Sequence, residues 1–217
     1  MANPSVASML LRLRGLLNEP EAAFVSDDGN EGIVWISDGV VNFYDAVVSQ
    51  LQEDGRDKSV QHPFLRHFVT ALSGVTVADT DEYDFPETMD YPLWLWYGSP
   101  LRPAVESTMD AFDLDRDGDL YGPSVTRAIW TPQGSQFRLF VMPGDAGSPT
   151  EEIAWKLWYV ARPQPLTGVG DLLPIPQNWT SGALYWAAAQ WAAKERKAVD
   201  SWMQLFQMAA TNTAKRR

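Results

Sequence analysis

The sequence contains no cysteine, only two histidines, and far fewer basic than acidic residues. Without cysteine, disulfide bonds, thiolate metal sites and cysteine nucleophiles are excluded, and two histidines are a meagre supply of ligands for zinc. The 28 acidic and 17 basic residues give the 217-residue chain a net charge of −11. Because that charge repels phosphate backbones, the composition argues against a general nucleic-acid-binding protein.

Long apolar runs are missing as well. Arg12 and Arg14 interrupt the apolar start of the chain, which therefore lacks the hydrophobic region of a secretory signal. The longest weakly charged helical stretch, residues 179–193, falls short of the ~20 residues that cross a bilayer. We therefore expect synthesis in the cytoplasm and no contact with a membrane.

Tryptophan, by contrast, is abundant. Ten tryptophans occur in a chain whose 45% hydrophobic and 21% charged residues are otherwise ordinary for a globular protein. Such large amphipathic rings are typical of interfaces as well as of cores. We therefore expect more buried area than one small core provides.

The first 74 residues have the periodicity of three helices. Asn3 is a candidate cap for the first helix, which Asn18–Pro20 end, and Ser37 is a candidate cap for the second. Pro63 suits the start of a third helix, which would close near Gly74. The apolar residues at helical spacing are Val6, Met9, Leu10, Leu13, Leu16 and Leu17, then Ile36, Val40, Tyr44, Val47, Val48 and Leu51, then Phe64, Leu65, Phe68 and Leu72.

From Val75 the pattern changes to short β-branched and aromatic runs separated by Gly, Pro and Asp turns, which predicts a β-domain. The last run, Ile153–Val160, alternates as a half-buried strand does. Residues 162–176 are rich in proline and are expected to form a linker rather than a core element. The other predicted strand regions are Val75–Val77, Leu93–Tyr97, Val125–Trp130 and Phe137–Met142.

Residues 179–214 have the strongest helical pattern and predict one long closing helix. A seam of mostly apolar residues runs along one side of this helix. The seam either packs on the N-terminal helices, is shared with a neighbouring subunit, or does both along different turns. The predicted fold class is α+β: a helical bundle of residues 1–74 and 177–217, with an antiparallel β-domain inserted at 75–176. The seam residues are Leu184, Ala188, Trp191, Glu195, Ala198, Trp202, Leu205 and Ala209.

Few residues suggest chemistry. Asp113, Asp115, Asp117 and Asp119 have the spacing of a calcium loop, but Ser124 stands where that loop needs a bidentate glutamate. We therefore favour an acidic turn without metal. His62 and His67 stand five residues apart, so on one helix they would point ~140° apart and could not share a metal unaided.

No nucleophile elbow, zinc-protease, Walker or dinucleotide-binding motif occurs, so we predict no catalytic residue, no metal and no cofactor. Aromatic residues at 91–97 invite a sugar-stacking interpretation, but their tight alternation fits a core strand better. Two alternative functions remain open: a β-rich carbohydrate- or calcium-binding module on a helical stalk, and an enzyme whose site carries no recognisable motif. The aromatic residues concerned are Tyr91, Trp94, Trp96 and Tyr97.

The order of several short motifs resembles that of the head-to-tail adaptor (connector) proteins of tailed bacteriophages. Residues 16–20 (LLNEP) and 35–38 (WISD) are similar to that family's opening helix, loop and second helix. Residues 83–86 (YDFP) resemble its Y-x-L-P entry into the β-region, with Phe85 at the usual leucine. Gly122-Pro123 and residues 139–143 resemble the next strands of that family. Residues 175–179 (IPQNW) and 184–187 (LYWA) resemble its long closing helix.

This resemblance implies a non-catalytic structural protein of the virion neck. It implies a dodecameric ring that joins the portal protein to a downstream tail or stopper protein and leaves a channel for DNA. Burial of two lateral faces would account for the tryptophan content, and a negative wall would let DNA slide without specific binding.

The last third of the chain differs in charge from the rest. Residues 151–217 hold 8 bases and 5 acids, whereas residues 1–60 and 61–150 have net charges of −6 and −8. Adaptors of the resembled kind dock a C-terminal segment on the portal, so we expect the portal contact here. The candidate residues are Lys194, Arg196, Lys197, Trp202, Lys215, Arg216 and Arg217.

Overall fold

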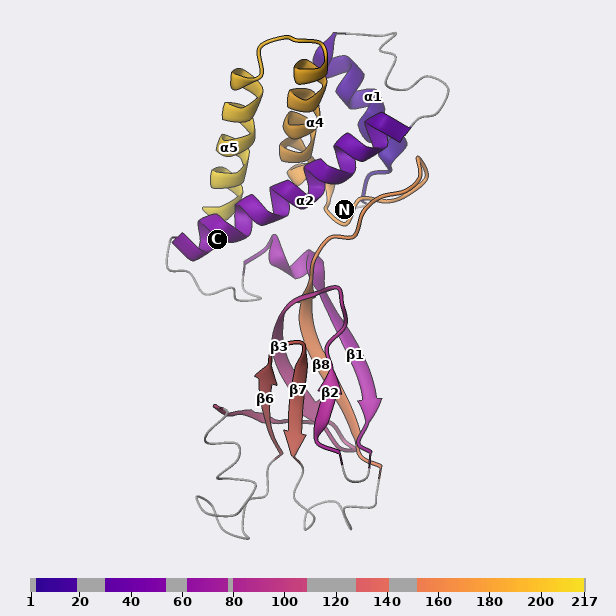
Figure 1. Cartoon of the computed structure of the whole chain (residues 1–217), viewed down its shortest axis with the longest axis vertical. Coiled ribbons are helices and arrows are strands. Elements are labelled where there is room, and N and C mark those ends of the chain that lie inside the picture. Colours follow the sequence, from indigo (N-terminus) through magenta and orange to yellow (C-terminus); the bar gives the residue numbers. More distant parts are fainter. Residues whose placement is uncertain are drawn as a thin grey trace. The chain divides into compact units, whose positions relative to one another are not determined.

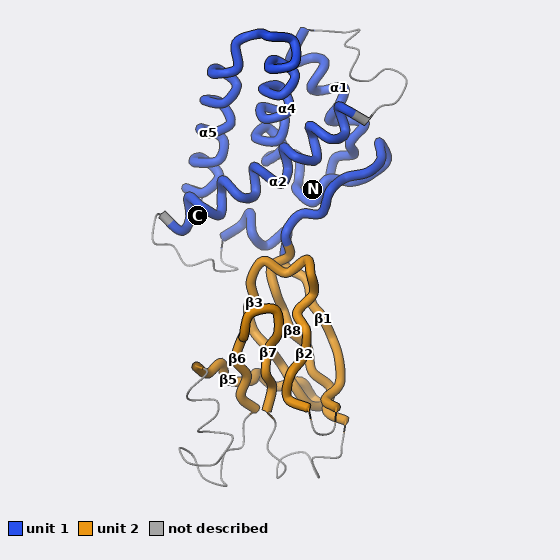
Figure 2. Tube along the Cα trace, viewed as in Figure 1, with its two compact units in different colours: residues 1–68, 162–217 blue, residues 69–161 orange. Residues whose placement is uncertain are grey.

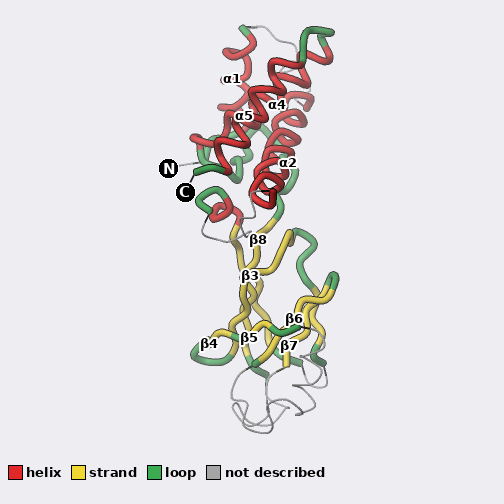
Figure 3. Tube along the Cα trace, turned by 90° about the vertical axis from the view of Figure 1, so that its left-hand side faces the viewer, coloured by secondary structure: helices red, strands yellow, loops and turns green. Residues whose placement is uncertain are grey.

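The computed structural model describes residues 3–18, 30–53, 62–77, 80–108, 128–140 and 152–216, and the statements below concern these residues. The chain divides into a unit of residues 1–68 and 162–217 and a unit of residues 69–161 (Figure 2). Helices build the first unit and strands the second (Figures 1 and 3). The α+β class is confirmed, with strands inserted between two helical parts of the chain.

The helical unit contains α1 (Val6–Leu17), α2 (Asn30–Glu53), α4 (Thr180–Lys194) and α5 (Asp200–Ala214), with the 3-10 turns η2 (Leu65–Phe68) and η4 (Gln177–Trp179). Ser5, not Asn3, caps α1, since the Ser5 Oγ accepts the N–H of Ser8 at 3.3 Å. The predicted apolar face of α2 is confirmed, because its six residues from Ile36 to Leu51 are all buried. Both α1 and α5 pack on α2 and α4.

Two glycines let α2 and α4 approach closely. A Cβ atom on Gly39 of α2 would lie 2.5 Å from the backbone oxygen of Ala183, and one on Gly182 would overlap the ring of Phe43. The facing residues of α4 include Ala187 and Ala188, both fully buried. Small side chains therefore fix the distance between these two helices.

The second unit is a sandwich of two four-stranded sheets, with strand orders β1-β8-β3-β4 and β2-β7-β6-β5. Neighbouring strands run antiparallel except β5 and β6, which are parallel. Leu95, Trp130, Phe137 and Leu157 come from both sheets and share one buried core, so the sheets pack face to face. The strands are β1 (Val69–Val75), β2 (Glu82–Asp84), β3 (Met89–Tyr97), β4 (Arg102–Pro103), β5 (Val105–Glu106), β6 (Ile129–Gln133), β7 (Gln136–Phe140) and β8 (Ala154–Ala161).

The predicted third helix is wrong. Helical structure after Pro63 is limited to the single turn η2, and Val69–Val75 form β1, paired along its whole length with β8. A full ladder of backbone hydrogen bonds and the branched residues of β1 outweigh the helical spacing of Leu72. The first helical part therefore ends at Phe68 instead of Gly74.

The single long closing helix is also wrong. Arg196 has a left-handed backbone, with φ 54°, and its N–H donates to the Ala193 oxygen while that of Lys197 donates to the Ala192 oxygen. These two bonds form a Schellman motif, which ends α4 and lets α5 start in a new phase. Beyond this turn the predicted seam does not pack within the chain, since Leu205 is exposed and Phe206 is buried instead.

The proline-rich segment is not a free linker. Leu173 and Ile175 are buried, and the carbonyl oxygens of Val169 and Asp171 accept the N–H groups of Ala7 and Val6 at the start of α1. Backbone groups at a helix N-terminus need such partners, so this segment completes α1. Residues 162–176 therefore belong to the helical unit, and the predicted boundary at 176 moves to 161.

The Ser37 cap is wrong too, because α2 begins at Asn30. Ser37 lies inside the helix, buried, and its Oγ accepts the N–H of Leu166 at 2.9 Å. The residue therefore holds the proline-rich segment against α2 instead of starting the helix.

Candidate protein-docking surfaces

The predicted basic residues lie at two ends of the α4–α5 hairpin. Lys194, Arg196 and Lys197 surround the turn between the helices, whereas Lys215 and Arg216 follow the far end of α5 (Figure 1). The 15 residues of α5 rise by about 22 Å, so the two groups form separate sites. Arg217 lies outside the described residues.

The lysines at the turn make contacts inside the helical unit. Lys194 forms an ion pair with Glu31 of α2, and its Nζ lies 5.7 Å from the ring centroid of Trp35. Lys197 Nζ lies 3.9 Å from the ring centroid of Trp191, within cation–π range. Part of the positive charge at the turn is therefore used to hold α4 in place.

The cations at the end of α5 are presented differently. Lys215 and Arg216 are exposed, and neither side chain takes part in an ion pair with another described residue. The turn just before them is anchored, because Thr213 and Ala214 are buried. The C-terminal end of a helix also favours positive charge. Of the candidate groups, this one is the best placed to meet an acidic partner.

Trp202 has a packing role in the helical unit. The residue is half-buried, and its ring stacks on that of Tyr185 with centroids 6.5 Å apart and an interplanar angle of 30°. The contact joins α5 to α4. Only part of the Trp202 side chain is therefore available to a partner.

The tryptophans of β3 contradict the expectation of an aromatic core strand. Leu95 and Tyr97 point into the sandwich, but Trp94 and Trp96 are 37% and 36% exposed on the outer face. On that face Trp94 pairs with Trp158, and Lys156 Nζ lies 4.5 Å from the ring centroid of Trp158. The sandwich thus carries three indoles and an ammonium group on its outside.

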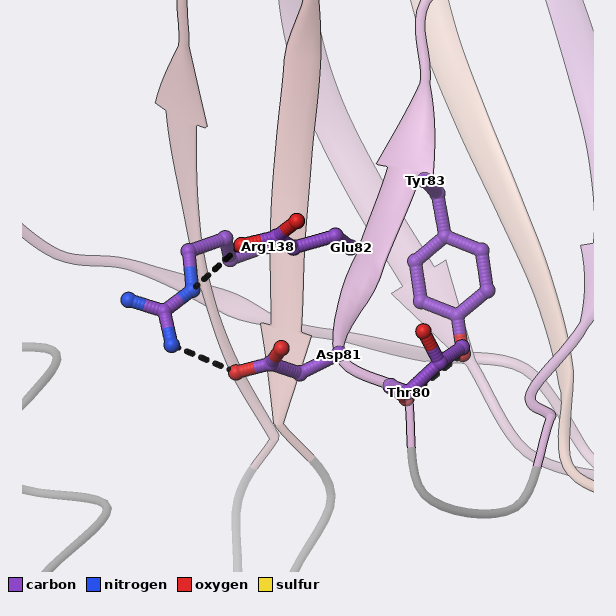
Figure 4. Close-up of polar contacts among 5 residues, drawn as sticks. All are labelled: Thr80, Asp81, Glu82, Tyr83 and Arg138. Carbon is purple, nitrogen blue, oxygen red and sulfur yellow. Dashed lines mark hydrogen bonds and ion pairs between the residues drawn. The ribbon is translucent and has the colours of Figure 1, made fainter.

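Arg138 of β7 is a buried charged side chain, which stands between the core residues Phe137 and Leu139 and so points to the other face of its sheet (Figure 4). Its Nη2 lies 2.7 Å from Asp81 Oδ2 and its Nε 4.0 Å from Glu82 Oε1. Beside it, the Tyr83 hydroxyl donates to the Thr80 oxygen at 3.3 Å. The two contacts of Arg138 fasten β7 to β2 and to the residue before it, whereas the Tyr83 bond holds the turn that precedes β2, so we assign the cluster to structure.

In the part of the chain that the structure describes, the histidines and acidic residues form no metal site. Within the described residues, no group of three or more histidines and carboxylates is close enough to hold an ion. His62 is buried, and His67 lies edge-on to Trp179 at 5.0 Å, where burial lowers the pKa of His67. Residues Asp113–Asp119 lie outside the described residues. Among the described helices, none has the length and apolar character to cross a membrane.

Sequence reasoning missed two exposed apolar rows on the helical unit. Leu11 of α1 is 66% exposed and Met208 of α5 is 59% exposed. A signal was available, because residues 201–214 contain no charged side chain although the chain as a whole is 21% charged. The apolar residues of α5 were instead assigned to a continuous seam.

The profile of the SU10 adaptor protein family matches residues 4–217 and so spans both units. No protein of curated function matches the chain. The family match agrees with the adaptor-like order of motifs and with the helical unit that encloses a β-insertion. The chain therefore belongs to the SU10 adaptor protein family, a family of bacteriophage head-to-tail adaptors.

Proposed function

We propose that this adaptor assembles into a ring, of twelve copies by analogy with the resembled adaptors, in the neck of the virion. The ring joins the portal protein to the downstream tail or stopper protein and leaves a channel through which DNA passes without specific binding. The role is structural and not catalytic. The observation that carries the proposal is the family match, which covers both units instead of one.

We place the portal contact at the end of α5. Residues 194–217 hold six bases and two acids, on a chain of net charge −11. Lys215 and Arg216 are exposed beyond a buried last turn, whereas Lys194 is paired with Glu31. Such a basic end fits an acidic surface of the portal, and electrostatic attraction of this kind weakens as salt is raised.

The test is a truncation that stops after Ala214. A longer deletion from Asn212 would remove buried Thr213 and Ala214 and would damage the fold. Loss of Lys215–Arg217 should leave circular dichroism and melting temperature unchanged but weaken binding to the portal of the same genome. Sedimentation of the mixture at several salt concentrations measures the effect.

A control variant removes the same charge elsewhere. Arg66→Ser, Arg102→Ser and Arg162→Ser together neutralise three exposed cations at other positions of the sequence. We expect this variant to bind the portal better than the truncated chain. Equal binding by the truncated and intact chains would remove the tail from the interface.

A second candidate function is carbohydrate binding, which the outward Trp94, Trp96 and Trp158 favour, because exposed indoles stack on sugar rings. Calorimetric titration with neutral oligosaccharides tests it, and the variant Trp94→Ala with Trp96→Ala should then lose the heat signal. The calcium alternative is tested by melting in calcium and in chelator. A calcium-dependent rise that Asp115→Asn with Asp117→Asn abolishes would support it.

A further inference from the structure

The exposed side of α5 is a row without charge. Ser201, Leu205, Met208 and Asn212 are all exposed, and their spacing of four, three and four places them on one side of the helix. The buried residues of α5 lie on the opposite side. We call this row the α5 face, and Leu205 and Met208 are its protruding apolar side chains.

The exposed side of α1 is a second such row. Ala7, Leu11 and Gly15 are spaced by four residues and are all exposed, opposite the buried side of α1. Exposed Val169 lies next to them, since its carbonyl oxygen accepts the N–H of Ala7 at 2.9 Å. We call these four residues the α1 face.

The two faces lie on opposite flanks of the helical unit. In Figure 1, α5 lies at the left of this unit, α1 at the right, and α4 between them. In Figure 3, which looks from the α5 side, α1 lies behind α5. Each face is therefore free to meet another molecule while the other face is occupied.

From this geometry we infer that the α5 face of one copy packs on the α1 face of the next copy. Such a contact joins two different surfaces, so it repeats from copy to copy and closes into a ring where the rotation allows. The inference deepens the proposed ring-forming adaptor and rests on it for its biological setting. It adds the two surfaces through which neighbours touch.

Charge favours a second copy as the occupant. Two chains of net charge −11 repel, so a contact between them must avoid acidic surfaces. The outer side of α2 is such an acidic surface, since Glu31 and Asp38 are exposed there. Both faces are free of acidic residues, and charge-poor centres are typical of protein interfaces.

Shape favours the same pairing. On the α1 face, small residues stand on each side of exposed Leu11, and nothing lies within 4 Å of the position that a Gly15 Cβ would occupy. Leu205 and Met208 protrude from the α5 face. Larger side chains on one helix fit the gaps between small ones on another.

The expected contact is weak for a single pair of copies. Helices of 12 and 15 residues are only about 18 and 22 Å long, so one helix pair buries far less than the ~1,600 Å² of a standard interface. We therefore expect the isolated chain to be monomeric or weakly associated. On a portal, a copy within the ring makes both contacts at once.

Single cysteines test the contact without background, because the chain has none. Leu11→Cys and Met208→Cys each place a thiol on one face at an exposed position. The full-length variants are mixed at a concentration on the order of 1 mM, which populates even millimolar contacts. A short bis-maleimide is added, and the products are separated on a denaturing gel. Gln52→Cys, exposed on α2, is the control partner for both.

The expected result is a dimer band from the Leu11→Cys and Met208→Cys mixture about tenfold stronger than from either variant alone or with Gln52→Cys. A double variant carrying both thiols should give a ladder of higher species. Two results would overturn the inference: a mixture no stronger than the control, or Met208→Cys alone cross-linking as well as the mixture, which indicates a two-fold contact.

Portal co-sedimentation of the same variants separates this inference from the proposed function. If the intact chain binds the portal but the mixture does not cross-link, the adaptor function stands and the assigned faces are wrong. If the mixture cross-links but the intact chain binds no portal, the contact stands and the proposed adaptor function fails.

Discussion

The contact between α2 and α4 and the interior of the sandwich are built from side chains of opposite size, although the helical unit also buries large rings such as Phe43 and Phe64. Between α2 and α4 the helical unit uses Gly39, Gly182 and buried alanines, so backbones nearly touch. The sandwich uses large rings, including Trp130, Phe137 and Trp155, with Phe137 and Trp155 edge-to-face at 5.2 Å. The contact between α2 and α4 should therefore be most sensitive to added volume, and the sandwich to lost volume.

The largest expected effect is on the sandwich. Trp130→Ala should lower the free energy of unfolding by about 4 kcal/mol, because Trp130 is 1% exposed and its removal leaves a large cavity. Urea unfolding of the full chain measures it. Trp96→Ala, on the outer face of the same unit, should lower the free energy of unfolding much less. Equal losses in the two variants would contradict the assignment of inner and outer faces.

The next effect concerns added volume in the helical unit. Gly39→Ala should destabilise by about 2 kcal/mol, since the new methyl group would meet the backbone of Ala183, which cannot rotate away. Gly15→Ala is the matched control on α1, where the methyl group meets open space and should stabilise by about 0.5–1 kcal/mol. A stabilised Gly39→Ala would show that α2 and α4 are less tightly packed than described.

The ion pairs of the two units should also differ in how much they contribute to the free energy of unfolding. Asp81→Asn should cost about 1–2 kcal/mol, because it removes a charged partner 2.7 Å from buried Arg138. Asp45→Asn removes an exposed pair with Arg162 in the helical unit and should cost under about 1 kcal/mol. Melting temperatures of the two variants at low and high salt measure the loss of stability. A larger loss for Asp45→Asn than for Asp81→Asn would contradict the prediction.

The smallest effect is a gain. Arg196→Gly should stabilise the chain by about 1 kcal/mol, because glycine adopts the left-handed backbone of the α4–α5 turn without steric cost. Asn18→Gly, at the left-handed end of α1, should change stability less, since asparagine already tolerates this conformation. Loss of stability in Arg196→Gly would mean that the arginine side chain contributes contacts that outweigh its strain.

These two turns also show how much of the fold could be predicted. Asn18 is a usual residue for a left-handed helix end, and the end of α1 was predicted there correctly. Arg196 is not, so two helices were predicted as one and the phase of α5 was lost. The apolar periodicity of α2 and the alternation of β8 were readable because each element has one buried face.

The remaining features of the fold could not be predicted because they depend on partners far away in the sequence. The proline-rich segment has no periodic pattern, and its role depends on bonds to α1 and to Ser37 that local sequence does not indicate. Leu72 has helical spacing but pairs with Leu157 in a ladder. The candidate basic residues were predicted as one charged region, and only the structure separates those at the turn from those at the end of α5.

We propose that this chain is a ring-forming adaptor that docks on a portal. The most direct measurement is the particle mass of the portal of the same genome, alone and saturated with the intact chain, by sedimentation with negative-stain microscopy. We expect a discrete complex whose added mass is a whole number of chains, twelve for a dodecamer, arranged as a ring with an open centre. Portal particles of unchanged mass and shape, even at low salt, would contradict it.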